Sequence, residues 1–256
     1  MKIWALADLH LSLGVPSKSM EVFGPNWTSY QEKMHASLSR CLAQEDLLLL
    51  AGDISWALHL DEVLVDLEWI DAFPGTKLLL KGNHDHWWPS SAKLKKLLPP
   101  SIHFIYNNAF DFGEVTIGGT RLWESSEYSY EGSIQMQDNP RARHQTEEQL
   151  LHQKEEDKKI FARELERLKL SLKQLNPKAK WRIAMTHYPP IGPDLAPSAA
   201  SAILEANKID ICLFGHMHNV KKGSLELGSA RGVRYLFTAA DYLNFEPRLV
   251  YNSSTS

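Results

Sequence analysis

The chain has 256 residues, a formal net charge of −3 and a pI of about 6.4. This length suits one domain, with or without an insertion, and the acidic balance argues against a nucleic-acid-binding protein. No stretch approaches the roughly 18 apolar residues of a membrane span. Cys41 and Cys212 lie far apart in apolar surroundings, which predicts buried thiols in a reducing compartment. We therefore expect a cytoplasmic protein with no membrane span and no nucleic-acid partner.

The first hundred residues alternate between short apolar runs and segments with helical periodicity. The apolar runs predict buried strands over residues 3–7, 47–51 and 77–80. The periodic segments predict helices over residues 28–44, 56–73 and 90–98, the second of them capped by Ser55. Strands and helices that alternate in this way indicate an α/β sheet.

From Ser101 onward the pattern changes. Short runs separated by turn residues predict a β-meander over residues 102–123, with a turn at Gly118 and Gly119. A polar loop over 124–143 and a long charged helix over 146–175, with a break near Asp157 as an alternative, follow the meander. The remaining chain predicts strands over 181–186 and 209–214, a helix over 199–207, hairpins over 223–250 and a frayed tail over 252–256.

Polar side chains stand where five of the predicted strands end. They are carboxylates, imidazoles and one amide: Asp8, His10, Asp53, Asn83, His187, His216 and His218. Ligands of α/β sheets bind outside the carboxyl ends of the strands, so we expect one site at one sheet edge. Seven donors exceed the three or four that one zinc ion takes, and they suit two ions that share a bridging carboxylate.

The donor types indicate which metals and which substrates the site would take. Oxygen and imidazole nitrogen without thiolate suit Mn, Fe, Zn or Co, and we expect two such divalent ions, with Mn favoured in vitro. Two divalent ions, two carboxylates and a bridging hydroxide leave a net charge of about +1. Such a site would attract a phosphate ester and stabilise the charge that develops on it.

The ordered blocks Asp8-x-His10, Gly52-Asp53, Gly82-Asn83-His84-Asp85, a lone His187 and Gly215-His216-x-His218 resemble the calcineurin-like metallophosphoesterases. Five blocks in order make the resemblance specific. It implies an α/β fold of two mixed β-sheets packed face to face, with helices outside. Residues 8–12, 52–57 and 82–88 are similar in particular to a bacterial group of predicted phosphohydrolases. The resemblance does not cover residues 124–175, so it implies no substrate.

The resemblance also implies a role for each residue of the blocks. The first metal would be bound by Asp8, His10 and His218, the second by Asn83, His187 and His216, and Asp53 would bridge them. His84 would stabilise or protonate the leaving oxygen, and Asp85 would orient His84. A metal-bridging hydroxide would attack phosphorus in line. No second carboxylate follows Gly52-Asp53, and this departure touches no expected ligand.

Residues outside the blocks allow two interpretations each. Trp87 and Trp88 are either core residues or a stacking wall for a flat leaving group. Arginine and tyrosine side chains in or beside the polar loop are either solvated or form a phosphate clamp: Arg121, Arg141, Arg143, Tyr128 and Tyr130. His59 and His86 are interpreted as surface residues. Residues 124–175 would form a cap-like insertion that selects the substrate, within a single domain over 1–256.

Two functions remain open at this point. The first is a phosphomonoesterase or phosphodiesterase acting on a small phosphorylated substrate. The second is a non-catalytic scaffold of the same fold whose metal pocket binds a partner. A scaffold would usually have lost ligands or replaced His84, and this sequence retains all of these residues. A nuclease is disfavoured because the chain has no basic stripe.

Overall fold

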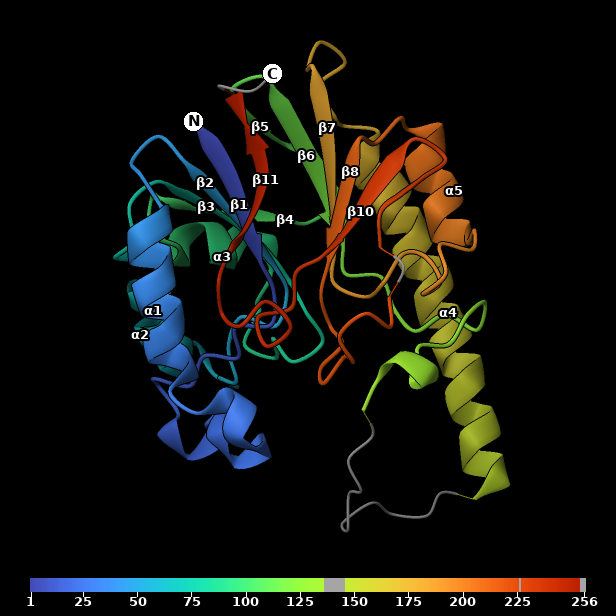
Figure 1. Ribbon diagram of the computed structural model, residues 1–256, viewed down its shortest axis with the longest axis horizontal. Coiled ribbons are helices and arrows are strands. Elements are labelled where there is room, and N and C mark those ends of the chain that lie inside the picture. The colour runs from blue at the N-terminus through green and yellow to red at the C-terminus, as the bar shows by residue number, and fades with distance from the viewer. Residues whose placement is uncertain (136–145, 226, 254–256) are drawn as a thin grey trace.

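Two β-sheets lie face to face at the centre of the molecule, and helices cover the outer face of each sheet (Figure 1). The computed structural model describes residues 1–135, 146–225 and 227–253. The expected architecture of two packed mixed sheets between helices is therefore confirmed. No helix in the described ranges is long and apolar enough to cross a membrane.

The first sheet has the strand order β11-β1-β2-β3-β4. Four strands are parallel, β1 (Lys2–Leu6), β2 (Leu47–Ala51), β3 (Thr76–Leu80) and β4 (Ile102–Ile105), and β11 (Arg248–Asn252) pairs with β1 in the antiparallel direction. Its outer face is covered by α1 (Tyr30–Cys41), α2 (Leu60–Asp71) and α3 (Ser91–Leu97). Three short 3₁₀ turns precede α1: η1 (Pro16–Lys18), η2 (Met20–Phe23) and η3 (Pro25–Trp27).

The second sheet has the strand order β5-β6-β7-β8-β10-β9. The central strands β6 (Val115–Thr120), β7 (Trp181–Thr186), β8 (Ile211–Phe214) and β10 (Val233–Phe237) are parallel, and β5 (Phe110–Phe112) and β9 (Ser229–Ala230) are antiparallel edges. Its outer face is covered by α4 (Glu147–Leu172) and α5 (Ala199–Ala206). The short 3₁₀ turn η4 (Glu131–Ser133) precedes α4.

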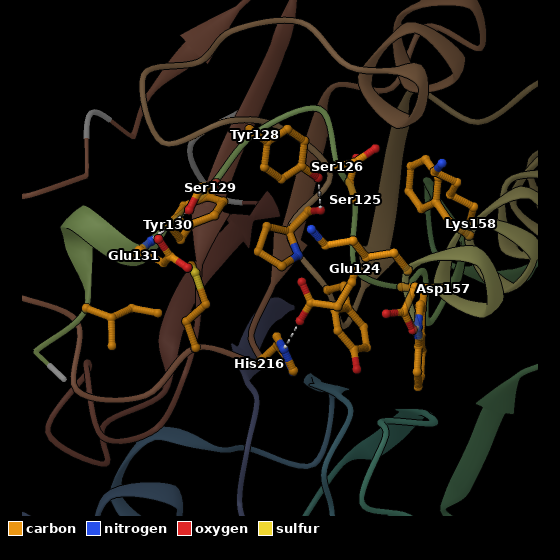
Figure 2. Close-up of a pocket in the computed structure, with 17 residues that line it drawn as sticks. Glu124, Ser125, Ser126, Tyr128, Ser129, Tyr130, Glu131, Asp157, Lys158 and His216 are labelled. Atoms are coloured by element: carbon orange, nitrogen blue, oxygen red, sulfur yellow. Dashed lines mark hydrogen bonds and ion pairs between the residues drawn. The ribbon is translucent and has the colours of Figure 1, made fainter. Parts of the chain in front are cut away.

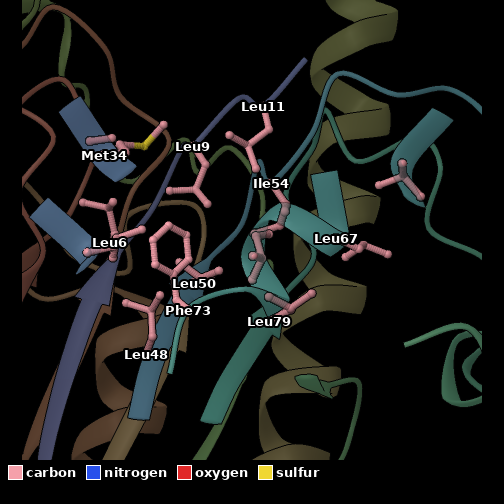
Figure 3. Close-up of a cluster of buried hydrophobic side chains, with 14 of the residues drawn as sticks. Leu6, Leu9, Leu11, Met34, Leu48, Leu50, Ile54, Leu67, Phe73 and Leu79 are labelled. Carbon is pink, nitrogen blue, oxygen red and sulfur yellow. The ribbon is translucent and has the colours of Figure 1, made fainter. Parts of the chain in front are cut away.

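Side chains of β2 show why the strands are apolar throughout. Leu48 and Leu50 point outward and pack with Met34 of α1 and Leu67 of α2 (Figure 3). Leu47, Leu49 and Ala51 point the other way, into the layer between the sheets. Successive strand residues face opposite sides, and both sides are covered here, so the run has no polar alternation.

The predicted meander over residues 102–123 is wrong. β4 pairs with β3 in the first sheet, and the chain then crosses to the second sheet, where β5 and β6 form a hairpin. Gly118 and Gly119 do not form a turn, because they lie inside β6. A Cβ at Gly119 would lie 1.9 Å from the carbonyl oxygen of Met185, and one at Gly118 would lie 3.0 Å from Oγ of Ser171. These glycines therefore let the neighbouring strand and helix approach closely.

Two other element predictions need correction, and the alternative of a broken long helix is excluded. The second predicted helix begins at Leu60 rather than at residue 56, because Ser55 pairs with Leu11 in a β-bridge and does not cap the helix. The long helix α4 has no break at Asp157. The last strand does not form a hairpin in the second sheet, because β11 crosses to the first sheet and pairs with β1. Cys212 is buried as expected, whereas Cys41 is half-buried, and both are free thiols.

Lys77 interrupts the apolar run of β3, and its side chain is nevertheless buried. Its ammonium group donates hydrogen bonds to the carbonyl oxygens of Asp71, at 3.2 Å, and of Phe73. It also donates to Oγ of Ser101 at 3.3 Å. Positive charge at a helix C-terminus is favourable, so Lys77 satisfies carbonyl groups that the end of α2 leaves without a helical partner.

We predict that Lys77→Met lowers the free energy of unfolding by about 1–3 kcal/mol, because buried carbonyl groups lose their donor. Urea denaturation of the two proteins measures this difference. Lys178→Met is the control, because Lys178 is exposed and its replacement should change the free energy by less than about 0.5 kcal/mol. Equal stability of all three proteins would contradict the role given to Lys77.

Candidate metal centre

The seven strand-end donors come together at one edge of the two sheets. Residues from the first sheet follow β1, β2 and β3, and residues from the second sheet follow β7 and β8. Main-chain hydrogen bonds join the loops that carry them. The N–H of Asp8 donates to Gly52 at 2.9 Å, that of His10 to Asp53 at 3.0 Å, and that of Gly215 to His187 at 3.1 Å.

Four of the donors have a left-handed backbone conformation. The φ angles are 58° at Asp8, 46° at His10, 52° at Asp53 and 76° at His216. This conformation is uncommon for residues other than glycine, although Asp and His adopt it more readily than most. It turns each side chain sharply at the end of its strand, and such strain persists where the surrounding structure enforces it.

Asp8, His10 and His218 form the first group of donors. One ligand atom from each lies within 4.8 Å of the others. Nε2 of His10 lies 3.0 Å from Nε2 of His218 and 3.7 Å from Oδ2 of Asp53. The resemblance implied these three residues for one metal, and the fold places them together.

Asn83, His187 and His216 form the second group. Oδ1 of Asn83 lies 2.7 Å from Nε2 of His187 and 3.0 Å from Nδ1 of His216. Nε2 of His187 also lies 3.4 Å from Oδ1 of Asp53. The two oxygens of Asp53 therefore face different donor groups, one towards His10 and the other towards His187.

Each imidazole that contributes one nitrogen to these groups is held through its other nitrogen, with one exception. Nδ1 of His218 lies 3.2 Å from Oδ1 of Asp241, and Nδ1 of His187 lies 3.0 Å from the carbonyl oxygen of Ala51. Nε2 of His216 lies 3.5 Å from Oε1 of Glu124. Such outer partners fix the orientation of a metal-binding ring. Sequence reasoning missed Asp241, although it follows the end of β10 as the other donors follow their strands.

His10 is the exception, because its buried Nδ1 has no hydrogen-bond partner in the described chain. Burial lowers the pKa of His10 well below its usual value and raises the pKa of Asp8 to about 7. Burial opposes a charge on His187, but the carboxylate of Asp53 raises the pKa of that residue to about 9. Buried carboxylates and imidazoles at these distances fit a divalent cation, which favours the ionised carboxylate and the neutral ring.

His84 stands beside the donors without belonging to either group. Its ring packs on Trp56 at 4.4 Å between ring centroids and lies 5.6 Å from the ring of His10. Trp56 also stacks on His10, at 5.0 Å with 22° between the planes. Sequence reasoning had placed Trp56 in a helix, whereas it forms an aromatic support for both imidazoles.

The carboxylate of Asp85 does not hydrogen-bond to the His84 ring in the described chain. The two oxygens of Asp85 accept hydrogen bonds from three main-chain N–H groups and from Nε1 of Trp87. The main-chain donors are Ile54 at 2.9 Å, Ser55 at 3.1 Å and Gly82 at 2.7 Å. Asp85 therefore ties the loop after β2 to the loop after β3, and so it positions Asp53 relative to Asn83.

Three glycines make room for the donors. A Cβ at Gly82 would lie 2.0 Å from Oδ1 of Asp53, and a Cβ at Gly215 would lie 2.3 Å from Oδ2 of Asp8. A Cβ at Gly52 would lie 2.4 Å from Nδ1 of His187. Any larger residue at these three positions of the sequence blocks would therefore clash with a side chain of the site.

The residues outside the sequence blocks, for which two interpretations were open, lie in different parts of the molecule. Trp87 and Trp88 are 3% and 8% exposed and belong to the core that packs on the first sheet, which favours the core interpretation. Arg121 is half-buried, and its guanidinium lies over the ring of Trp123 at 4.4 Å. Arg141 and Arg143 lie outside the described residues. His59 and His86 are exposed, as expected.

A cavity of about 690 Å³ opens beside His216 (Figure 2). The loop after β6 and the N-terminal half of α4 line it, and this half of α4 extends past the sheet edge (Figure 1). Aromatic side chains include Trp123, Tyr128 and Tyr188, while Lys154 and Lys158 add positive charge. The C-terminal half of α4 belongs to the helical layer instead, with Leu168 and Leu172 buried against the second sheet.

A family model of the calcineurin-like phosphoesterases matches residues 1–220. The chain belongs to this family. Membership in the calcineurin-like phosphoesterases, together with the Asp and His donors, indicates a phosphohydrolase that uses divalent metal and acts on a small phosphorylated substrate.

One solved structure supports the same fold for this calcineurin-like phosphoesterase, and a second gives a lower score. A phosphopantetheinyl hydrolase from Mycobacterium tuberculosis is similar over 100% of this chain and 97% of its own, with a TM-score of 0.57 and 15% identity. A protein of unknown function from Aquifex aeolicus is similar over 97% of this chain and 95% of its own, with a TM-score of 0.48 and 14% identity. Comparison with curated proteins finds no match.

We predict that Gly82→Ala reduces metal binding by at least about tenfold, because the new methyl group would displace the Asp53 carboxylate and its outer hydrogen bonds. Equilibrium dialysis against Mn measures this. Gly132→Ala is the matched control, because a Cβ at Gly132 meets no atom within 4 Å. Unchanged Mn affinity in Gly82→Ala would show that the close approach to Asp53 does not matter for the site.

Proposed function

We propose that the protein is a dinuclear metal-dependent phosphoesterase that hydrolyses a small phosphate monoester or diester. The observation that carries this proposal is the position of Asp53. Its two oxygens face separate groups of donors, at 3.7 Å from His10 and 3.4 Å from His187. A carboxylate between two such groups is suited to bridge two ions, as in other two-metal sites with a spacing of about 3.5–4 Å.

The donors would divide between the two ions as the resemblance of the sequence blocks implies. Asp8, His10 and His218 would hold one ion, Asn83, His187 and His216 the other, and Asp53 both. Bound ions would supply a water nucleophile at neutral pH and positive charge for the phosphoryl oxygens. Asp241, Glu124 and the carbonyl group of Ala51 keep three of the imidazoles in a fixed orientation.

His84 would act on the leaving group. Its main-chain N–H donates to Oδ1 of Asp53 at 2.9 Å, so the residue is anchored beside the bridging position. Its ring, supported by Trp56, makes no side-chain hydrogen bond in the described chain and is free to donate a proton or a hydrogen bond to the leaving oxygen. Asp85 would contribute indirectly, because it holds the loops that carry Asp53 and His84.

The cavity beside His216 would receive the part of the substrate that is not hydrolysed. Its aromatic lining suits a flat or apolar group, and its volume of about 690 Å³ falls within the range of small-molecule sites. Residues 124–175 would then act as a cap that selects the substrate, through the loop after β6 and the N-terminal half of α4. Binding energy from this remote part of the substrate would serve catalysis at the phosphate.

We predict that protein loaded with Mn contains about two ions per chain and hydrolyses esters in a panel of monoesters and diesters. Mass spectrometry with an inductively coupled plasma counts the metal, and phosphate release measures activity. Asp53→Asn should bind at most about one ion and lose activity, because the bridge loses its charge. Asp61→Asn is the matched control, because Asp61 is exposed on α2. A ratio of one in the wild type would contradict the dinuclear site, and metal binding without hydrolysis of any ester would favour the scaffold.

We predict that His84→Gln keeps its metal and loses about 10²–10⁴-fold in kcat, the usual contribution of general acid catalysis. Metal content and kcat are measured on the same preparation of each protein. The control is His86→Gln, two residues away and exposed, which should change kcat by less than about threefold. Loss of metal from His84→Gln would make His84 a ligand, and full activity would remove it from the reaction.

A further inference from the structure

A second cavity, of about 400 Å³, lies where β3, β4 and β6 end and α4 passes over them. It shares no lining residue with the cavity beside His216. Trp88 and Tyr106 contribute aromatic walls, and lysine and arginine side chains are part of the remaining lining. The volume falls within the range of small-molecule sites, roughly 300–1,000 Å³.

Four cationic side chains line this cavity around one carboxylate. The cations are Lys81, Arg121, Arg163 and Arg167, and the carboxylate is Glu164, whose side chain is 1% exposed. This concentration of positive charge contrasts with the formal charge of −3 of the whole chain. A concave surface that carries one sign of charge focuses the electrostatic potential and attracts the opposite charge.

Glu164 does not account for this many cations. One of its oxygens accepts a hydrogen bond from Thr120 at 2.8 Å, and the other accepts one from Nη1 of Arg167 at 2.7 Å. Arg163 and Arg121 lie farther from that second oxygen, at 3.7 and 3.9 Å. A guanidinium carries five N–H donors, so both of these arginines retain donors for another acceptor.

Lys81 is the clearest case of an unmatched cation. Its ammonium group has no hydrogen-bond or ion-pair partner in the described part of the chain, although the side chain is half-buried. Lys81, Arg121, Arg163 and Arg167 line one cavity of about 400 Å³ that contains the single carboxylate of Glu164. Like charges this close repel one another, and a bound anion would relieve that repulsion.

We propose that this cavity binds a compact oxyanion of two or more charges, such as a phosphate group, through Lys81, Arg121 and Arg163. Arginine matches the geometry of phosphate oxygens with paired N–H donors, and Lys81 adds a point charge. Arg167 is engaged by Glu164, to which its Nη1 donates a hydrogen bond at 2.7 Å.

This oxyanion is distinct from the phosphate at the metal centre. The main chain of Arg121 separates the two sites, because its carbonyl oxygen accepts hydrogen bonds from His187 at 3.1 Å and Tyr188 at 2.9 Å, while its side chain lines the cavity. Lys81 stands on the other side of Gly82 from the donor Asn83. The anion site therefore adjoins the metal centre without sharing a side chain with it, and its existence does not depend on the proposed hydrolysis.

Calorimetric titration of the metal-loaded protein with sulfate tests the site. We expect Arg163→Ala, and Lys81→Gln in a second protein, each to weaken binding by at least about tenfold, as loss of a charge-assisted hydrogen bond would. Lys169→Ala is the matched control, because it removes a cation from the same helix. The ammonium group of Lys169 pairs with Glu166 at 2.7 Å, and Lys169 does not line the cavity. Arg163 is 55% exposed, so its variant should fold, and its melting temperature is checked against that of Lys169→Ala.

Steady-state kinetics of the same proteins, measured with and without sulfate, identify the source of the anion. If it is a second phosphate of the substrate, sulfate raises KM for a bisphosphate ester far more than for p-nitrophenyl phosphate. If it is a free anion, sulfate changes kcat for p-nitrophenyl phosphate, and Arg163→Ala abolishes that change. The proposal is overturned if sulfate does not bind to the wild type. It is also overturned if sulfate binds equally to Arg163→Ala, Lys81→Gln and Lys169→Ala, which would place the ion on the metals.

Discussion

The metal centre depends on the apolar layer between the two sheets. Asp8, Asp53 and Asn83 are carried by the first sheet, while His187, His216 and His218 are carried by the second. Contacts of 2.7–3.4 Å between Nε2 of His187 and the side chains of Asn83 and Asp53 therefore bridge two separately hydrogen-bonded sheets. The distance between the sheets is set by buried residues such as Leu49, Leu78, Ile183, Met185 and Leu213. Because protein interiors are close-packed, a change in that layer would alter the spacing of the donors without touching any of them.

Loops at the edge of the two sheets hold the donor side chains in a fixed arrangement. Strained backbone at Asp8, His10, Asp53 and His216 is held by hydrogen bonds within and between the loops. The carboxylate of Asp85 is central to this, because it joins the loops after β2 and β3 while itself lying fully buried. Burial raises the pKa of Asp85 to about 6, and four N–H donors compensate for its desolvation. Within its sequence block, Asp85 thus has a structural role, because it joins the loops after β2 and β3.

The pattern of strand ends predicted that the seven residues lie together, because parallel strands deliver their carboxyl ends to one side of a sheet. It did not show that these strands belong to two sheets. Pairing between distant segments was less predictable. The runs at β4 and β5 are adjacent in sequence, and no local feature shows that they belong to different sheets. Gly118 and Gly119 resembled a turn because glycine at a close strand contact and glycine in a turn have the same sequence signal. Trp56 and Asp241 support donors through tertiary contacts, which have no periodicity to reveal them.

The antiparallel pairing of β11 with β1 has a consequence for synthesis of the chain. β1 precedes the other strands of the described fold, and one of its two edges is covered by β2, which follows about forty residues later. Its other edge is covered by residues 248–252, near the end of the described chain. During translation β1 therefore presents an unpaired strand edge until residues 248–252 have been made, and such edges template aggregation. Lys2, at the start of this strand, is exposed, and charged side chains on an edge are one way in which proteins limit that hazard.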